Sequence, residues 1–245
     1  MNLDLEDKVV FVTGGTGAIG KAIVRAFIAE GAIVIFTCNR AEAKMAELMS
    51  SSKDGRCIGY KMAVTDQRGM GAIAKEVYET YKRIDILINN AGIAEVMPFP
   101  LIDEEDWDET FNVNAKGTFL TTKEIVRFMI KNGSGSIINI GSLAAERIME
   151  VPVHYAASKA AVTGFTLSLA RELSRYNIRV NCVVPGLIDG GVGLNTPEKQ
   201  RKQYIDFCLS GRLGTPEEVA DFIVFMASSR ASFVNGQIMQ VDGGI

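Results

Sequence analysis

Apolar runs alternate with helical patterns along the whole chain. The first run starts at Lys8 and ends in glycines, and a helical pattern with Ile19, Ile23 and Phe27 on one face follows it. A second apolar run then covers 32–37. Continuous apolar strands, as opposed to alternating ones, are typical of parallel sheets that helices cover on both faces. The start of the chain therefore predicts an α/β fold.

The same alternation continues through the rest of the sequence. Further strands are expected over 57–62, 85–88, 136–140, 178–183 and 237–241, and further helices over 41–49, 66–81, 154–174, 197–208 and 216–227. The pattern over 104–131 is long enough for two helices with a bend. Strands that alternate with helices predict a doubly wound sheet. We expect one Rossmann-type domain over residues 1–245, with seven mostly parallel strands and helices on both faces.

Composition excludes several classes of protein. The 245 residues are 47% hydrophobic, which is enough for the core of one α/β domain. A formal net charge of −3 argues against nucleic-acid binding driven by positive charge. No apolar stretch approaches the ~20 residues that span a bilayer. Four scattered cysteines and a single histidine, His154, favour neither a metal site nor a disulfide scaffold. Because no signal-peptide layout is present, we expect a cytoplasmic protein.

A glycine-rich loop separates the first expected strand from the first helix. Residues 13–20 read TGGTGAIG. Glycines let the backbone turn tightly and approach a pyrophosphate, and the helix N-terminus offers unpaired N–H groups to it. A simple tight turn can have the same composition. The strand before the loop and the helix after it favour dinucleotide binding.

Residues suited to proton transfer lie in the middle of the chain. Tyr155 and Lys159 share one face of an expected helix, so the ammonium is expected to lower the pKa of the phenol. Such a phenol exchanges a proton with a carbonyl or an alcohol. Ser142 follows a strand, at the sheet edge where ligands bind, and Asn114 can hold a water on a proton path. Their alternatives are a turn serine and a solvent-facing asparagine. His154 lies on another face, which favours a structural or pocket-rim role.

Together these motifs resemble those of the short-chain dehydrogenase/reductase family. The loop is similar to the family's TGxxxGxG fingerprint, with Ala18 in place of the middle glycine, and 89–92 reads NNAG. Further similarities cover nearly the whole chain: Pro185-Gly186, GRLGTPEEVA over 211–220 and VDGG over 241–244. The resemblance implies a catalytic set of Asn114, Ser142, Tyr155 and Lys159. In that set Tyr155 is the general acid/base, Ser142 stabilises the carbonyl, Lys159 holds the nicotinamide ribose, and Asn114 completes a proton relay.

The resemblance also implies a nicotinamide cofactor. The positions expected to bind it are Gly14, Thr16, Ala18, Ile19, Gly20, Asn39, Arg40, Val64, Asn90, Gly92, Tyr155, Lys159, Pro185, Gly186 and Ile188. Cys38 stands where NAD-dependent members carry an aspartate, and Arg40 can bind a 2′-phosphate, so NADP is favoured over NAD. Gly17 argues against NADP, because many NADP-dependent members have a basic residue there. Ala63 and Gly190 each replace a side chain that hydrogen-bonds the cofactor, so we expect weakened binding.

Two segments are expected to select the substrate. The first is the loop 143–153, and the second is 187–212, whose glycines and following helix suit a lid. An ordinary flexible loop is the alternative for the second. The apolar candidates for the pocket are Met97, Leu143, Ile148, Met149, Val151 and Leu194. They favour a substrate with an apolar portion.

Within the family the chain is most similar to 3-oxoacyl-[acyl-carrier-protein] reductase-like members. That similarity implies a 3-oxoacyl thioester substrate, fatty acid or polyketide metabolism, and a homotetramer or homodimer. An acidic carrier protein needs a basic surface, and the candidates for it are Lys123, Arg127, Lys131, Arg175 and Arg179. Scattered solvated charges are an equal interpretation. Two alternative functions remain: a dehydrogenase of a free secondary alcohol, and a non-catalytic cofactor-sensing or interaction protein.

Overall fold

Seven strands form one sheet in the computed structural model, which describes residues 2–52 and 54–245. Their order is β3-β2-β1-β4-β5-β6-β7, and every neighbouring pair is parallel. The strands are β1 (Val9–Thr13), β2 (Ile33–Cys38), β3 (Cys57–Lys61), β4 (Ile86–Asn89), β5 (Gly135–Ile140), β6 (Ile178–Pro185) and β7 (Ile238–Val241). The predicted sheet is confirmed, and it is fully parallel instead of mostly so. Strand order reverses between β1 and β4, and ligands bind α/β sheets beyond the carboxyl ends at such a point.

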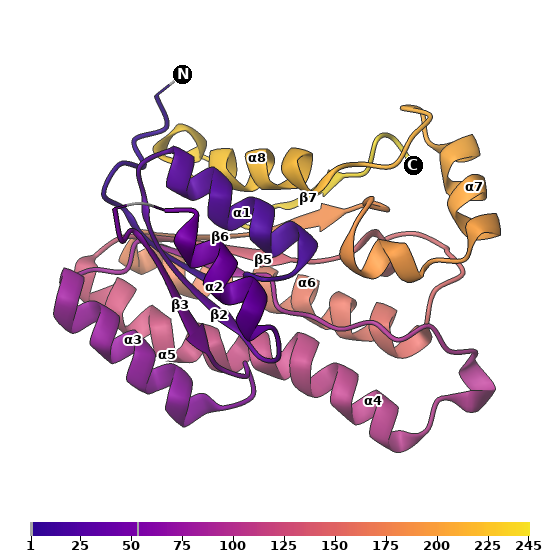
Figure 1. Ribbon diagram of the computed structural model, residues 1–245, viewed down its shortest axis with the longest axis horizontal. Helices are drawn as coiled ribbons and strands as arrows, with labels where there is room; N and C mark the ends of the chain where they lie inside the picture. The colour runs from indigo at the N-terminus through magenta and orange to yellow at the C-terminus, as the bar shows by residue number, and fades with distance from the viewer. Residues whose placement is uncertain (1, 53) are drawn as a thin grey trace.

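Helices cover both faces of the sheet, as Figure 1 shows. One face carries α1 (Ala18–Ala29), α2 (Glu42–Ser50) and α8 (Pro216–Ala227), and the other carries α3 (Gln67–Tyr81), α5 (Gly117–Asn132) and α6 (Val153–Leu173). Two shorter helices, α4 (Glu104–Phe111) and α7 (Glu198–Phe207), lie beyond the sheet's carboxyl edge (Figure 1). The five inner strands, β2, β1, β4, β5 and β6, bury nearly every side chain, which explains their uninterrupted apolar runs, whereas the edge strands β3 and β7 are mostly half-buried. No helix of the described residues is long and apolar enough to cross a membrane.

The bend expected within 104–131 is a π-helical segment, Asn112–Lys116, between α4 and α5. One wider turn shifts the faces of the two helices relative to each other, and such π turns are common at functional sites. This segment contains Asn114, which is fully buried. The Thr118 hydroxyl donates to the Asn114 carbonyl at 2.8 Å, so that carbonyl keeps a partner inside the irregular turn.

Arg179 is not part of an exposed basic surface, contrary to expectation. Its guanidinium donates to the carbonyls of Met226 and Val234 at 2.9 Å and of Ser228 at 3.1 Å. The carbonyls at the end of a helix lack intrahelical partners, and Met226 lies in the last turn of α8. Arg179 therefore joins β6 to the end of α8. It is not part of the basic surface predicted for a carrier protein.

We expect Arg179→Met to lower the free energy of unfolding by roughly 2–4 kcal/mol, because charge-assisted hydrogen bonds are lost and carbonyls are left without partners. Denaturant unfolding measures this loss. Arg175→Met on the neighbouring surface is the control, with a change within about 0.5 kcal/mol. Equal effects of the two substitutions would contradict a structural role for Arg179.

Candidate active site

The glycine loop closes on itself and on the loop after β4. A Cβ on Gly20 would lie 2.1 Å from the Gly14 carbonyl oxygen, and Gly14 itself has a φ of +67°, which favours glycine. The Asn90 side-chain amide donates to the carbonyls of Thr13 and Gly14, both at 3.0 Å. The Thr13 hydroxyl accepts from the backbone N–H of Asn90 and Ala91, both at 3.0 Å. These contacts hold the NNAG segment against the start of α1.

A cavity of about 1050 Å³ opens beside this loop at the carboxyl edge of the sheet. Every position expected to bind the cofactor lies on its wall, from Gly14 at the glycine loop to Ile188 beyond β6. Ser142, Tyr155 and Lys159 line the same cavity. The cavity extends from the ends of β2 and β3 to the ends of β5 and β6. This shape suits a dinucleotide that lies across the point where the strand order reverses.

One buried hydroxyl on the cavity wall lacks a partner. Thr37, at the end of β2, is 1% exposed, and its Oγ1 makes no hydrogen bond to any of the described residues. Buried polar groups in proteins are nearly always hydrogen-bonded, so this atom is placed to bond a ligand. Cys38 and Arg40 line the wall beside it. The tight glycine loop, where a Cβ on Gly20 would collide with the Gly14 carbonyl, and the unpartnered Thr37 hydroxyl on the wall both fit a dinucleotide. Sequence reasoning passed over Thr37 because it reads as an ordinary strand residue.

Asn114 acts from behind the cavity wall. Its side-chain Nδ2 donates to the Ile93 carbonyl and to the Ser158 hydroxyl, both at 2.9 Å, and its Oδ1 accepts from the Ile93 N–H at 2.8 Å. A Cβ on Gly92 would lie 3.2 Å from Asn114 Oδ1 and 3.3 Å from Lys159 Nζ. The Asn114 and Lys159 side chains therefore both approach Gly92, which has no side chain of its own. This arrangement joins Asn114 to α6 and to the loop after β4.

A buried ladder of amides and hydroxyls lies behind the site. Asn89 at the end of β4 donates to the Thr122 hydroxyl at 2.9 Å and to Asn139 Oδ1 at 2.8 Å. Asn139 on β5 in turn donates to the Thr166 hydroxyl of α6 at 2.9 Å. Asn89 Oδ1 has no hydrogen-bond partner among the described residues, but the three donated hydrogen bonds are directional. The ladder therefore fixes α5 and α6 relative to the strand ends that carry the candidate catalytic residues.

The pKa of Tyr155 is raised, and the expected fall is wrong for this arrangement. Desolvation raises the pKa of the phenol, and the Ser142 hydroxyl lowers it by a smaller amount. Lys159 does not counter the desolvation, because its ammonium donates to the Ile140 carbonyl at 2.8 Å and lies 6.0 Å from the Tyr155 ring centroid. Tyr155 is therefore a protonated phenol at neutral pH and is suited to donate a proton.

Lys159 is itself perturbed: burial lowers the pKa of its ammonium from 10.5 to about 8. The unfolded chain keeps this proton up to higher pH than the folded chain does. Unfolding between about pH 8 and 10 therefore takes up a proton, and the free energy of unfolding rises with pH in that window.

We expect Lys159→Met to remove this rise. The shift corresponds to roughly 3 kcal/mol over the full window. Urea unfolding of wild type and variant from pH 7 to 10 measures the difference between them. Parallel curves for the two proteins would contradict the lowered lysine pKa.

The substrate end of the cavity is bounded by the loop after β5 and by α7. Of the expected apolar candidates, Leu143, Ile148, Met149 and Val151 line the cavity. Met97 and Leu194 are not on its wall, and Leu194 is 59% exposed. Val96 and Phe207 line it instead, where sequence reasoning had no signal to choose them. His154 is fully buried and is not on the wall, so the pocket-rim role is wrong and the structural one remains.

The segment after β6 leaves the sheet, and its two ends pair with each other at one point, which is here named the neck. At the neck, Asp189 N–H donates to the Gly214 carbonyl at 2.8 Å and Gly214 N–H donates to the Leu187 carbonyl at 3.1 Å. Beyond the neck, α7 is held by the chain after β7, because the Tyr204 hydroxyl donates to the Asp242 carbonyl at 2.7 Å. Ser210 N–H likewise donates to the Gly243 carbonyl at 3.0 Å. The segment is therefore fixed at both the neck and α7.

The geometry defines a class of protein: a Rossmann-type oxidoreductase that interconverts a carbonyl and an alcohol. Comparison with known proteins gives the same class. Residues 15–245 match the model of a family described as enoyl-(acyl carrier protein) reductase. The chain is similar to solved short-chain dehydrogenase/reductase structures from Serratia marcescens (TM-score 0.91, 32% identity, 98% of each chain) and Bacillus anthracis (TM-score 0.89, 33% identity, 98% of this chain and 96% of that one). It belongs to the short-chain dehydrogenase/reductase family.

Curated relatives match over the full length. The chain is 40% identical to a 3-oxoacyl-[acyl-carrier-protein] reductase of Thermotoga maritima, with 98% of each chain covered. It is 37% identical to the protein of that name in Aquifex aeolicus, with 100% of each covered. It is also 35% identical to a (2S)-[(R)-hydroxy(phenyl)methyl]succinyl-CoA dehydrogenase subunit of Thauera aromatica, with 99% of this chain and 98% of that one covered. Family membership implies a nicotinamide cofactor.

Proposed function

We propose that this chain reduces the ketone of a 3-oxoacyl thioester carried on an acyl carrier protein, with NADPH as cofactor. The observation that carries the proposal is the placement of Ser142, Tyr155 and Lys159 on the wall of the cavity that also contains every expected cofactor position, because a phenol beside Ser142 is a proton donor for a ketone oxygen. The full-length similarity to two 3-oxoacyl-[acyl-carrier-protein] reductases supports the substrate class. A bound nicotinamide supplies the hydride.

The chain's own residues have separate tasks in this proposal. Ser142 orients the ketone oxygen, and Tyr155 protonates that oxygen as negative charge develops on it. Lys159, whose ammonium donates to the Ile140 carbonyl, would hold the nicotinamide ribose. Asn114 positions the loop that carries Ile93 and links it to Ser158 in α6. The apolar wall formed by Leu143 and its neighbours receives the acyl chain.

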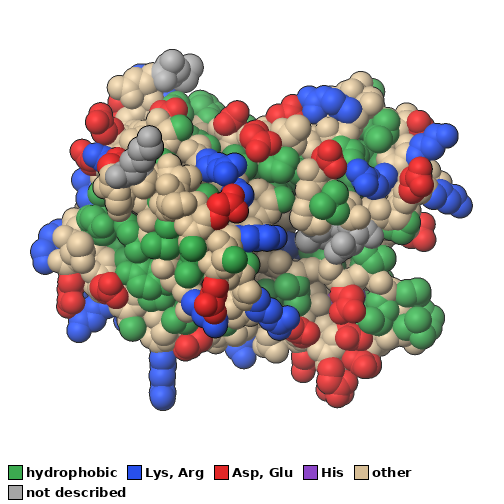
Figure 2. All heavy atoms as spheres, viewed as in Figure 1, with side chains coloured by type: hydrophobic (Ala, Val, Ile, Leu, Met, Phe, Trp, Pro, Cys, Tyr) green, Lys and Arg blue, Asp and Glu red, His purple; other side chains and the backbone are tan. Residues whose placement is uncertain are grey.

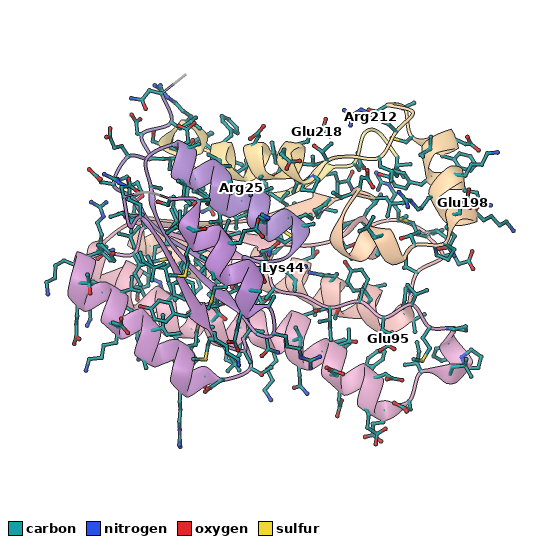
Figure 3. The ribbon with its side chains drawn as sticks, in the orientation of Figure 1. Arg25, Lys44, Glu95, Glu198, Arg212 and Glu218 are labelled. Carbon is teal, nitrogen blue, oxygen red and sulfur yellow. The ribbon has the colours of Figure 1, made fainter. Side chains whose placement is uncertain are left out.

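A cation on the cavity wall supports NADPH over NADH. Lys21 and Arg25 of α1 pair with Glu47 of α2, on which Lys44 also acts, and none of these side chains lines the cavity. Figure 3 shows Arg25 and Lys44 on these two neighbouring helices. Arg40, which starts the segment before α2, lines the cavity. The Arg40 guanidinium on this wall would bind the additional 2′-phosphate of NADPH.

The helices α4, α5 and α6 expose large apolar side chains. We propose that the chain acts as one cofactor-binding domain and forms a homotetramer or homodimer through α4, α5 and α6. Trp107, Phe119, Val153 and Leu167 on these helices are each at least 39% exposed and are the apolar side chains that such an interface would cover. Acidic side chains gather over α4 (Figure 2), so a carrier protein would avoid that end of the molecule.

All four cysteines are free and buried, which supports a cytoplasmic location.

The proposed activity is tested by NADPH oxidation followed at 340 nm with acetoacetyl-[acyl carrier protein], acetoacetyl-CoA and a free ketone. We expect turnover of both thioesters, with the highest kcat/KM for the carrier-protein form. Preference for the free ketone would favour the secondary-alcohol dehydrogenase. Binding of NADPH without turnover of any ketone would favour the non-catalytic alternative.

Cofactor choice is tested at Cys38. We expect Cys38→Asp to lower the ratio of kcat/KM for NADPH to that for NADH by about 100-fold, because a carboxylate there repels a 2′-phosphate and accepts a hydrogen bond from a ribose 2′-hydroxyl. Steady-state kinetics with both cofactors measure the ratio. Cys38→Ser, of similar size and without charge, is the control and keeps the wild-type preference. An unchanged ratio in Cys38→Asp would place the 2′-phosphate elsewhere.

A further inference from the structure

Gly190, just past the neck, faces Ala18 of the glycine loop at close range. A Cβ on Gly190 would lie 2.9 Å from Ala18 Cβ and 3.4 Å from Pro216 Cγ. Non-bonded carbon atoms prefer ~3.5–4.0 Å, so no side chain fits at Gly190 without a shift. The φ of Gly190 is 162°, which is extended backbone that any residue adopts. Space, and not backbone conformation, therefore requires the glycine.

The two facing residues belong to parts of the fold that cannot easily separate. Gly190 directly follows the hydrogen-bonded neck between Asp189 and Gly214. The chain continues from the neck into α8, where Thr215 and Glu218 form a capping box. Figure 3 shows Glu218 beside Arg212, with which it forms an ion pair at 2.5 Å. Buried side chains of α8 and α1 share one apolar core, and α1 begins at Ala18.

Ala18 also marks the place where a pyrophosphate is expected. The first backbone N–H groups of a helix have no intrahelical partners and bind phosphate. A Cβ on Gly191 would lie 3.4 Å from Ala18 Cβ and 3.9 Å from Ala18 N, so the backbone after the neck runs over this same helix terminus. The distance between that backbone and Ala18 therefore limits the passage for a pyrophosphate.

We propose that Ala18 and Gly190 are a matched steric pair that positions the 187–212 lid over the cofactor's pyrophosphate. The methyl group on the glycine loop takes the space that a side chain at Gly190 would need. Gly190 is thus a positioning residue for cofactor binding, and the two departures from the family pattern compensate each other. The inference rests on the proposed NADPH-dependent function only for its effect on cofactor affinity.

The test is a double-mutant cycle of wild type, Ala18→Gly, Gly190→Ala and the double variant. NADPH fluorescence titration gives the Kd, and thermal unfolding without cofactor gives the Tm. We expect Gly190→Ala to raise the Kd about tenfold and lower the Tm by about 3 °C in the Ala18 background. In the Ala18→Gly background the same change should alter the Kd less than about threefold and the Tm by less than about 1 °C.

Gly164→Ala is the matched control, because a Cβ there meets nothing within 4 Å. It should leave the Kd near wild type and leave the Tm unchanged or raise it, whereas Gly190→Ala lowers the Tm. Equal effects of Gly190→Ala in both backgrounds, or no effect in either, would overturn the steric pair. Because the Tm cycle needs no cofactor, the steric pair and the NADPH-dependent function can be rejected independently of each other. Coupled Tm values in a protein that does not bind NADPH would keep the pair and reject the cofactor. NADPH binding with uncoupled Tm values would reject the steric pair and keep NADPH as the cofactor.

Discussion

Tyr155→Phe is expected to lower kcat for ketone reduction by about 10³-fold and to leave the Kd for NADPH within about threefold of wild type. The phenol is the proton donor of the proposed reaction, and a positioned general acid contributes about 10²–10⁴-fold. The ring itself is retained, so its packing on the cavity wall persists. Loss in kcat without loss of cofactor binding is the signature of an interaction made only in the transition state.

Single-turnover absorbance at 340 nm, with NADPH pre-bound, measures this loss at the chemical step. Tyr176→Phe removes the hydroxyl of a partly exposed tyrosine just after α6 and should retain full activity. A Tyr155→Phe variant that keeps more than about a tenth of wild-type kcat would assign the proton donor to another group. One candidate on the wall would then be the Lys159 ammonium, through its lowered pKa of about 8.

Gly20→Ala is expected to raise the Kd for NADPH by about 100-fold. Its Cβ would lie 2.1 Å from the Gly14 carbonyl oxygen and 2.8 Å from Asn90 Nδ2. Both are fixed, since the Asn90 amide donates to that same carbonyl. The loop must open to admit the methyl group, and the helix terminus then loses its alignment with the pyrophosphate.

Fluorescence titration with NADPH measures the change in Kd, and thermal unfolding reports whether the variant remains folded. Gly164→Ala again supplies the comparison: it adds the same methyl group to a helical glycine with no neighbour within 4 Å. Alanine there should be neutral or raise stability by up to about 1 kcal/mol. Wild-type affinity in Gly20→Ala would show that the loop is wider than the structure indicates.

The fold could be predicted because its signals are local. Continuous apolar strands predict a covered parallel sheet, and Thr215 before Pro216 predicts the start of α8, which the capping box with Glu218 confirms. A bend within 104–131 was also predictable from the length of the helical pattern, although its position at Asn112–Lys116 was not. Its π-helical form was not, since no residue pattern distinguishes a wide turn from an ordinary one.

The candidate site was predicted by position but not by electrostatics. The loops that bear Ser142 and Gly92 follow strands, so their meeting at one sheet edge follows from the parallel topology. The pKa of Tyr155 depends on burial and on where the Lys159 ammonium points, and neither can be derived from spacing. Arg179 shows the same limit, because a charge that satisfies helix carbonyls looks identical in sequence to a solvated one.

The contacts that hold α7 set an order in which the site can form during synthesis. The glycine loop and the NNAG segment are made early, and β1 can pair with β4 once Asn89 has emerged. The substrate wall needs Tyr204 to bond Asp242, close to the last strand. Domains generally fold as units. Because the expected cofactor positions extend to Ile188, only the N-terminal part of the cofactor site, the glycine loop and the NNAG segment, emerges from the ribosome well before the candidate substrate wall.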